Sequence, residues 1–154
     1  MISMLECKVP PLAYVFFFSI IAYLLSRFWP LYLVHQPIFK ILGCTLCCVG
    51  IAVMVTSAVQ FRIRRTTLSP ISPIHASVFV SNGLFRITRN PMYLGMALMM
   101  MGGVFVLGAL SGGIVVALFM WLITKFQIEP EERALAARFG ESYLQYKKTV
   151  RRWL

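Results

Sequence analysis

Four apolar runs, each close to the length of a membrane-spanning helix, constrain this chain more than any other feature. They cover residues 9–28, 41–61, 91–107 and 113–126. A helix needs about 20 apolar residues to cross the hydrocarbon core of a bilayer. Because 59% of the 154 residues are hydrophobic and 13% are charged, the chain lacks the polar surface of a water-soluble domain. We therefore predict a single all-α, polytopic membrane domain with about four transmembrane helices.

The first run favours a span over a cleaved signal peptide. It is longer than the roughly 7–15 apolar residues of a signal sequence, and no A-x-A-like cleavage site follows it. The last two runs are joined by the short, glycine-rich segment 108–113. Such a connection predicts a tight antiparallel hairpin of two helices.

The basic residues orient these spans, because Lys and Arg are retained on the cytoplasmic side of a membrane. All of them except Arg27 and Lys40 lie near the N-terminus, in the loop 62–90 or from Lys125 onward. Four spans place the loop, the tail 127–154 and both termini in the cytoplasm, whereas five spans would move one terminus outside. We expect a multi-pass protein of a bacterial or archaeal inner membrane.

The net charge of +10 does not predict nucleic-acid binding, because the basic residues flank membrane spans. Their placement is typical of topology signals and of attraction to anionic lipid head groups. Cys44, Cys47 and Cys48 lie inside the second span and have no histidine at a metal-binding spacing. We predict no metal site there and interpret them as small packing residues. No sequence feature indicates the oligomeric state.

Two polar segments outside the spans are candidates for chemistry. The loop 62–90 is rich in Ser-Pro and Asn-Gly pairs, which are typical of a folded, turn-rich segment. The tail begins a predicted amphipathic helix with three acids, Glu129, Glu131 and Glu132. A carboxylate at the membrane boundary is costly unless it is paired or used. Arg86 and Arg89 precede the third span, so the opposed charges favour either a salt bridge or a ligand site.

Three motifs occur in a characteristic order around the last two spans. They are Ser81-Asn82-Gly83-Leu84-Phe85, then Arg89-Asn90-Pro91-Met92-Tyr93-Leu94-Gly95, then Glu131-Glu132-x-x-Leu135 with Phe139-Gly140-Glu141-x-Tyr143-x-x-Tyr146. Together they resemble the isoprenylcysteine carboxyl methyltransferase and phospholipid methyltransferase superfamily of integral membrane enzymes. The resemblance covers residues 66–154.

The resemblance implies a methyltransferase that uses S-adenosylmethionine, releases S-adenosylhomocysteine and binds its donor in a cytoplasmic pocket. The implied donor-binding residues are Ser77, Val78, Phe79, Val80, Phe85, Asn90, Pro91, Met92, Tyr93 and Glu131. The implied catalytic residues are Arg89, Tyr93 and Glu132, and the candidate substrate-binding residues are Gln127 and Lys125. The expected partners are the lipid bilayer and a lipophilic small-molecule substrate. A carboxylate suits the ammonium group or ribose hydroxyls of the donor.

Two positions depart from the family pattern. Asn90 stands where the carboxyl methyltransferase branch commonly has histidine, and both side chains can donate a hydrogen bond. Gln127 stands where the branch that methylates prenylcysteine has an arginine for the substrate carboxylate. This difference argues against a prenylcysteine substrate and leaves the donor site intact. The acceptor group, a carboxylate, an amine or a thiol, stays open.

Methyl transfer needs an acceptor held about 3 Å from the methyl carbon and shielded from water, and it needs no nucleophilic enzyme residue. Two alternatives remain: a non-enzymatic membrane scaffold that retains the fold, and a sterol-reductase-like enzyme that uses NADPH. A soluble Rossmann-type methyltransferase is excluded because no glycine-rich loop follows a strand. Binding of the methyl donor discriminates among the methyltransferase, the scaffold and the reductase hypotheses.

Overall fold

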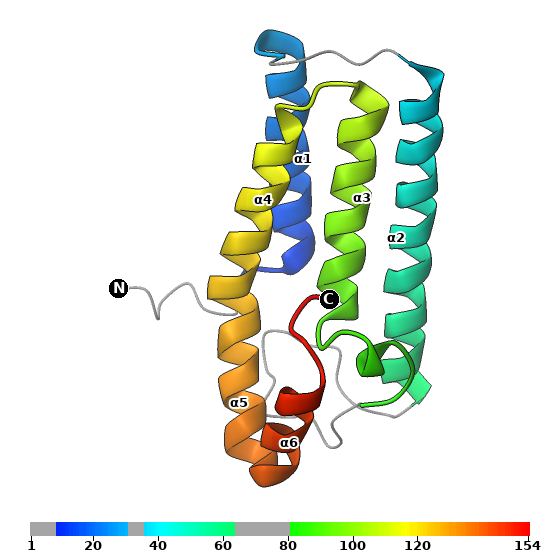
Figure 1. Cartoon of the computed structure of the whole chain (residues 1–154). Coiled ribbons are helices and arrows are strands. Elements are labelled where there is room, and N and C mark those ends of the chain that lie inside the picture. Colours follow the sequence, from blue (N-terminus) through cyan, green and yellow to red (C-terminus); the bar gives the residue numbers. More distant parts are fainter. Residues whose placement is uncertain (1–8, 31–35, 64–80) are drawn as a thin grey trace.

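The computed structural model describes residues 9–30, 36–63 and 81–154. Four helices form a bundle: α1 (Pro11–Phe28), α2 (Pro37–Ile63), α3 (Pro91–Leu107) and α4 (Gly112–Ile123). Helix α3 lies in the middle of the bundle, with α2 on one side and α1 and α4 on the other (Figure 1). A short 3-10 turn, η3 (Gly83–Arg86), precedes α3.

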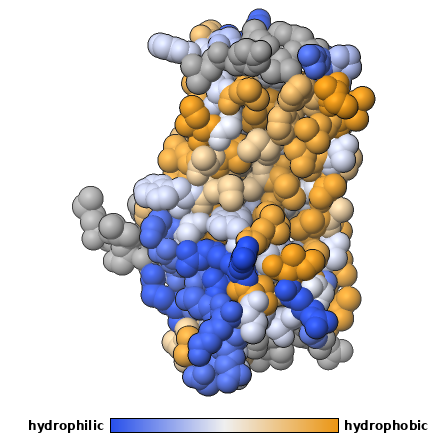
Figure 2. Space-filling model, in the orientation of Figure 1, coloured by the Kyte–Doolittle hydropathy of each residue, from blue (hydrophilic) through white to orange (hydrophobic). Residues whose placement is uncertain are grey.

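The outer surface of the bundle is apolar. Large hydrophobic side chains on α1 and α2 are exposed, among them Phe16 at 72% and Ile41 at 62%. Figure 2 shows this hydrophobic surface over most of the bundle, with hydrophilic residues gathered at one end. Water would disfavour an apolar patch of this extent, whereas hydrocarbon accommodates it. The chain is therefore an integral membrane protein.

Three helical segments are long and apolar enough to cross a membrane, namely Pro11–Phe28, Pro37–Gln60 and Gly112–Phe139. Helix α3 is also apolar but has 17 residues, one fewer than the shortest of these three segments. The prediction of an all-α, polytopic membrane protein is confirmed. The number of four spans stays a prediction.

Helix α3 begins and ends where its sequence indicates. Pro91 occupies its first turn, where the missing N–H would have no helical partner. Gly108 ends the helix with a φ of 72°, a left-handed conformation that favours glycine. Helix α2, by contrast, extends beyond the predicted range 41–61 at both ends, because Pro37 opens it and its last turn continues through Arg62 to Ile63.

Helices α2 and α3 touch through glycines spaced seven residues apart. Gly43 and Gly50 of α2 lie opposite Gly102 and Gly95 of α3. A Cβ atom added to Gly102 would lie 2.6 Å from the Gly43 carbonyl oxygen, and one added to Gly50 would lie 2.6 Å from the Gly95 carbonyl oxygen. Small residues let membrane helices approach closely and gain van der Waals contact. These four glycines therefore fix the distance between α2 and α3.

The cysteines of α2 divide between this contact and the outer surface. Cys47 is partly buried, and its thiol donates to the Met99 carbonyl oxygen over 3.6 Å. Cys44 and Cys48 are exposed on the outer face of the bundle. The packing interpretation thus describes Cys47 and is wrong for Cys44 and Cys48.

Neighbouring glycines in α3 allow a matched test of this packing. We expect Gly102→Ala to lower the free energy of unfolding by about 1–3 kcal/mol, because the new methyl group forces α2 away. Gly103→Ala is the control, since a Cβ atom there meets nothing within 4 Å. Both variants replace a glycine of α3 with alanine and therefore raise helix propensity equally. The difference between their melting temperatures in detergent thus measures the steric effect alone. Equal melting temperatures would contradict the close glycine contact.

The tail differs from the single amphipathic helix that was predicted. A π-helical turn, η4 (Thr124–Ile128), continues α4 into α5 (Glu129–Phe139), and a separate helix, α6 (Glu141–Thr149), follows. Gly140 separates α5 from α6 with a φ of 54°, a conformation that L side chains rarely adopt. The chain therefore turns sharply at Gly140, and its C-terminal residues return to the start of α3 (Figure 1).

Candidate functional site

A carboxylate lies between the start of α3 and the start of α5. The Tyr93 hydroxyl donates a hydrogen bond of 2.6 Å to Oε1 of Glu131. The Gln127 amide donates to the same oxygen over 3.3 Å. Tyr93 and Gln127 are both buried, at 7% and 1% exposure. The π-helical turn contains Gln127, and turns of this kind often occur at functional sites.

Glu131 titrates near neutral pH. Burial raises the pKa of its carboxyl from 4.5 to about 7, and the charge of Glu132 adds to the rise. The hydrogen bonds from Tyr93 and Gln127 favour the ionised form but do not cancel the effect of burial on the pKa. Helix α5 carries three glutamates in its first turn and lies beyond the apolar part of the preceding span. A carboxylate in this position can pair with a bound cation.

The next residue, Glu132, has a different environment. It is 4% exposed and contacts three cationic side chains. Arg89 Nη2 lies 3.0 Å from Oε1, Lys147 Nζ lies 3.2 Å from Oε2, and Arg152 donates to both carboxylate oxygens over 3.0 Å each. Burial pushes the pKa of Glu132 upward, but Arg152 and Arg89 outweigh it, so the pKa lies below its ordinary value. Glu132 is therefore ionised at neutral pH.

This ion cluster joins the segment before α3 to α5, α6 and the C-terminal segment. Arg89 pairs with Glu132 and also donates from Nη1 to the Lys147 carbonyl oxygen over 3.3 Å. Its Nε is buried and has no hydrogen-bond partner among the described residues. The predicted catalytic roles of Arg89, Tyr93 and Glu132 stay predictions.

The other residues of the central motif, which runs from Arg89 to Gly95, lie beside this cluster. Asn90 is 9% exposed, and its Nδ2 donates to the Arg152 carbonyl oxygen over 3.0 Å. Pro91 is buried, and Met92 is partly buried in the first turn of α3. Phe85 is buried in η3, and its carbonyl oxygen accepts a 2.6 Å hydrogen bond from the Tyr146 hydroxyl. The structure thus gathers the motif residues at one end of the bundle.

The remaining predicted residues are placed differently. Ser77, Val78, Phe79 and Val80 lie outside the described residues. Gln127 contacts Glu131, whereas Lys125 forms an exposed ion pair of 3.0 Å with Glu129. The two candidate substrate-binding residues are therefore placed differently: Gln127 is buried in the site, whereas Lys125 is on the protein surface.

Two residues of the site were absent from the sequence-based prediction. Thr88 donates from its hydroxyl to the Arg152 carbonyl oxygen over 3.2 Å, and its own Oγ1 accepts from the Asn90 backbone N–H. Arg152 contacts Glu132 and Asn90. The only sequence signal for Thr88 was its position before the central motif, and Arg152 resembled the other basic residues of the tail.

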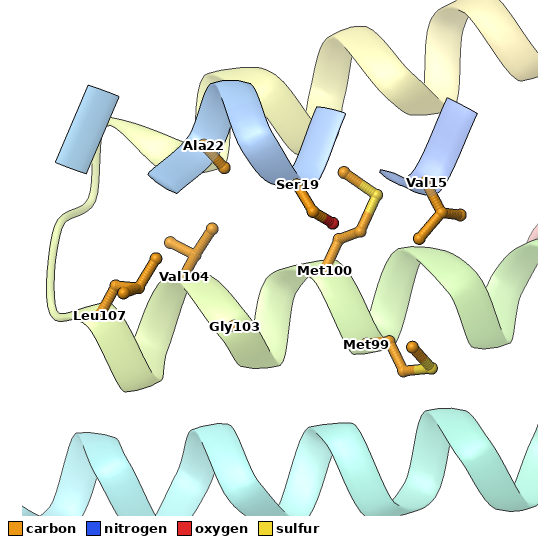
Figure 3. A pocket seen from close by; sticks show the side chains of 8 residues that line it. All are labelled: Val15, Ser19, Ala22, Met99, Met100, Gly103, Val104 and Leu107. Atoms are coloured by element: carbon orange, nitrogen blue, oxygen red, sulfur yellow. The ribbon is translucent and has the colours of Figure 1, made fainter. Parts of the chain in front are cut away.

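An apolar cavity of about 140 Å³ lies between α1 and α3, deeper in the bundle than the carboxylate. Val15, Ser19 and Ala22 of α1 point toward α3 (Figure 3). The α3 wall includes Met100 and Gly103. Since a helix rises 1.5 Å per residue, Met100 is about 10 Å along α3 from Tyr93.

Comparisons with known proteins agree on one family. The sequence model for phospholipid methyltransferases matches residues 38–142. The chain is 32% identical over 73 residues to the protein-S-isoprenylcysteine O-methyltransferase of Schizosaccharomyces pombe, which is 47% of this chain and 31% of that protein. It is 33% identical over 103 residues to the protein of the same name in Mus musculus, which is 67% of this chain and 35% of that protein.

A shorter relative is matched over its whole length. An uncharacterised protein of Haemophilus influenzae is 40% identical over 63 residues, which is 41% of this chain and 100% of that protein. The chain thus spans about a third of the two named methyltransferases and all of this smaller protein. No solved structure matches the chain.

Proposed function

Because this chain belongs to the phospholipid methyltransferase family, we propose that it transfers a methyl group from S-adenosylmethionine to a lipophilic acceptor at the membrane. The observation that carries the proposal is Glu131, a partly buried carboxyl held by Tyr93 and Gln127 beside the central motif. A buried carboxyl with a perturbed pKa is expensive for folding and is typical of functional sites.

The residues at this site fit the charges of the donor. Glu131 would hold the ammonium group or the ribose hydroxyls, because its ionised carboxyl accepts charge-assisted hydrogen bonds. The positive charge of Arg89, which lies in the ion cluster with Glu132, would favour the donor carboxylate. Pro91 and Met92 offer apolar surface for adenine. When bound, S-adenosylmethionine supplies an activated methyl group on a sulfonium, so the protein needs to orient the acceptor and exclude water.

The neutral side chain at position 127 bears on the acceptor. A carboxylate acceptor needs a positive partner, but Gln127 is uncharged and already donates to Glu131. The nearby cations Arg89 and Arg152 contact Glu132. These contacts support an acceptor that is uncharged at the reacting atom, such as a neutral amine.

The surroundings support a lipophilic acceptor. The cavity between α1 and α3 has a mostly apolar lining and lies within the apolar part of the bundle. An acceptor whose head group reaches Tyr93 would have its hydrocarbon chain alongside this part of α3. The polar donor would enter from the other side, at the hydrophilic end of the bundle (Figure 2). We further propose that this end and both termini face the cytoplasm, since most basic residues gather there.

The test is isothermal titration of the detergent-purified protein with S-adenosylmethionine, with S-adenosylhomocysteine and, as a control ligand, with NADPH. We expect micromolar binding of the first two and none of the third. Binding of NADPH alone would favour a reductase. No binding of any ligand by folded, monodisperse protein would favour a scaffold that retains the fold.

A further inference from the structure

The C-terminal residues of the chain pair with the central motif. Arg151 forms an isolated parallel bridge with Thr88, and its carbonyl oxygen accepts a 3.0 Å hydrogen bond from the Arg89 backbone N–H. Trp153 then packs against the apolar core of the bundle. The last few residues are thereby tied to the start of α3 over a sequence separation of about 60 residues.

Arg152 contacts this motif through its backbone. Its carbonyl oxygen accepts hydrogen bonds from Asn90 Nδ2 at 3.0 Å and from Thr88 Oγ1 at 3.2 Å. An amide whose nitrogen donates to a fixed acceptor cannot turn over without losing that bond. The Asn90 amide therefore keeps one orientation, in which Oδ1 is the end not held by Arg152.

Arg152 also acts through its side chain. Its Nε and Nη2 each donate to Glu132 over 3.0 Å, one to each carboxylate oxygen. A planar guanidinium that binds both oxygens of a carboxylate fixes its direction as well as its position. Glu132 also pairs with Arg89 over 3.0 Å, so the two arginines together orient the first turn of α5. That turn carries Glu131 toward Tyr93.

We propose that Arg152 is a positioning residue of the methyl-donor site. Its carbonyl group fixes the orientation of the Asn90 amide. Its guanidinium binds Glu132 and thereby holds α5 in the position where Glu131 contacts Tyr93. This inference rests on the proposed function, because it assigns Arg152 a role in a site that binds S-adenosylmethionine. Arg152 itself does not need to touch the donor.

The experiment compares Arg152→Gln with Arg151→Gln by titration with S-adenosylmethionine. Arg151 is exposed, so the control removes the same charge next to the same backbone. We expect Arg152→Gln to raise the dissociation constant about tenfold, because a charged hydrogen-bonded pair is lost. We expect Arg151→Gln to bind like the wild type. The Arg152→Lys variant, which keeps the charge but not the fork, should give an intermediate value.

Titration separates positioning from folding, since misfolded protein lowers the stoichiometry and leaves the dissociation constant of the folded fraction unchanged. A raised dissociation constant at full stoichiometry supports the proposal. A lower stoichiometry with an unchanged constant, in Arg152→Gln or, where that variant does not fold, in Arg152→Lys, would overturn it. If the wild type itself fails to bind S-adenosylmethionine, the proposed function is what fails.

A double variant tests the route through Glu132. If the side chain of Arg152 acts through Glu132, the effects of Arg152→Gln and Glu132→Gln on donor affinity are not additive, because either change breaks the same pair. Fully additive effects would show that the guanidinium does not act through Glu132, and would overturn that part of the proposal.

Discussion

Glu131→Gln is expected to weaken the binding of S-adenosylmethionine about 100-fold. The change keeps the shape of the side chain and its ability to accept the hydrogen bond from Tyr93, and it removes the negative charge. A charge-assisted hydrogen bond contributes about 1.5–3 kcal/mol, which corresponds to a factor of about 10–150 in affinity. Titration calorimetry measures the loss. Glu141→Gln, at an exposed position in α6, is the control for the change in net charge.

The pH dependence of the same titration identifies the carboxyl. Burial raises the pKa of Glu131 to about 7, so the charged form that pairs with the donor becomes scarce below pH 7. Wild-type affinity should fall about tenfold per unit of pH below 7 and level off above it. In Glu131→Gln this dependence should vanish. An unchanged affinity in the variant, or the same pH profile, would remove Glu131 from the donor site.

Stability should move in the opposite direction, which excludes misfolding as the cause. The folded state holds the Glu131 proton more tightly than the unfolded state, whose pKa is near 4.5. Ionisation of this group therefore opposes folding, and its cost grows as pH rises from about 4.5 to about 7. Glu131→Gln avoids that cost. At pH 8 the variant should melt at a temperature equal to or above that of the wild type, while binding the donor poorly.

Two adjacent glutamates thus have separate functions because their surroundings differ. Glu131 has neutral hydrogen-bond donors, and burial raises its pKa. Glu132 has Arg89, Lys147 and Arg152, which hold its pKa down. Pairs of titratable groups whose environments push their pKa values apart are a sign of distinct roles. In this chain Glu131 is the carboxylate proposed to bind a ligand, and Glu132 is the carboxylate that stabilises the fold.

The sequence predicts the parts of this architecture that depend on local patterns. Apolar runs and the Pro91 and Gly108 boundaries predict α3, because these residues act on the helix that contains them. The spacing of Gln127 and Glu131, one helical turn apart, was also visible and would have indicated their contact. The resemblance to a methyltransferase family rested on motif order and is confirmed.

The missed features depend on contacts between distant residues or on backbone geometry. Gly140 could have continued a helix, and only its positive φ separates α5 from α6. Arg152 reaches Asn90 and Glu132 because the chain turns there and returns to α3. From composition alone, a basic residue near a membrane span is typical of a topology signal, so nothing distinguished Arg152 from its neighbours.

Glu132→Ala is expected to cause the largest loss of stability. The carboxylate is 4% exposed and contacts Arg89, Lys147 and Arg152, so its removal leaves these cations without their shared partner. Breaking a buried ion pair by deleting one member costs about 3–5 kcal/mol. We expect a fall of this size in the free energy of unfolding, measured by thermal denaturation in detergent, and release of the C-terminal segment to proteolysis.

Glu129→Gln is the matched control on the same helical turn. Glu129 pairs with Lys125 at 3.0 Å and with Arg152 at 3.5 Å, whose side chains are 49% and 30% exposed, and such exposed pairs contribute about 1 kcal/mol or less. The pH dependence gives an independent check. Because the pKa of Glu132 is lowered on folding, its stabilisation is present above the ordinary pKa and is lost as pH falls through the folded value. In Glu132→Ala that acid-dependent loss should disappear. If both variants melted like the wild type, the ion cluster would be a surface feature, and the link from the C-terminal segment to the donor site would lose its physical basis.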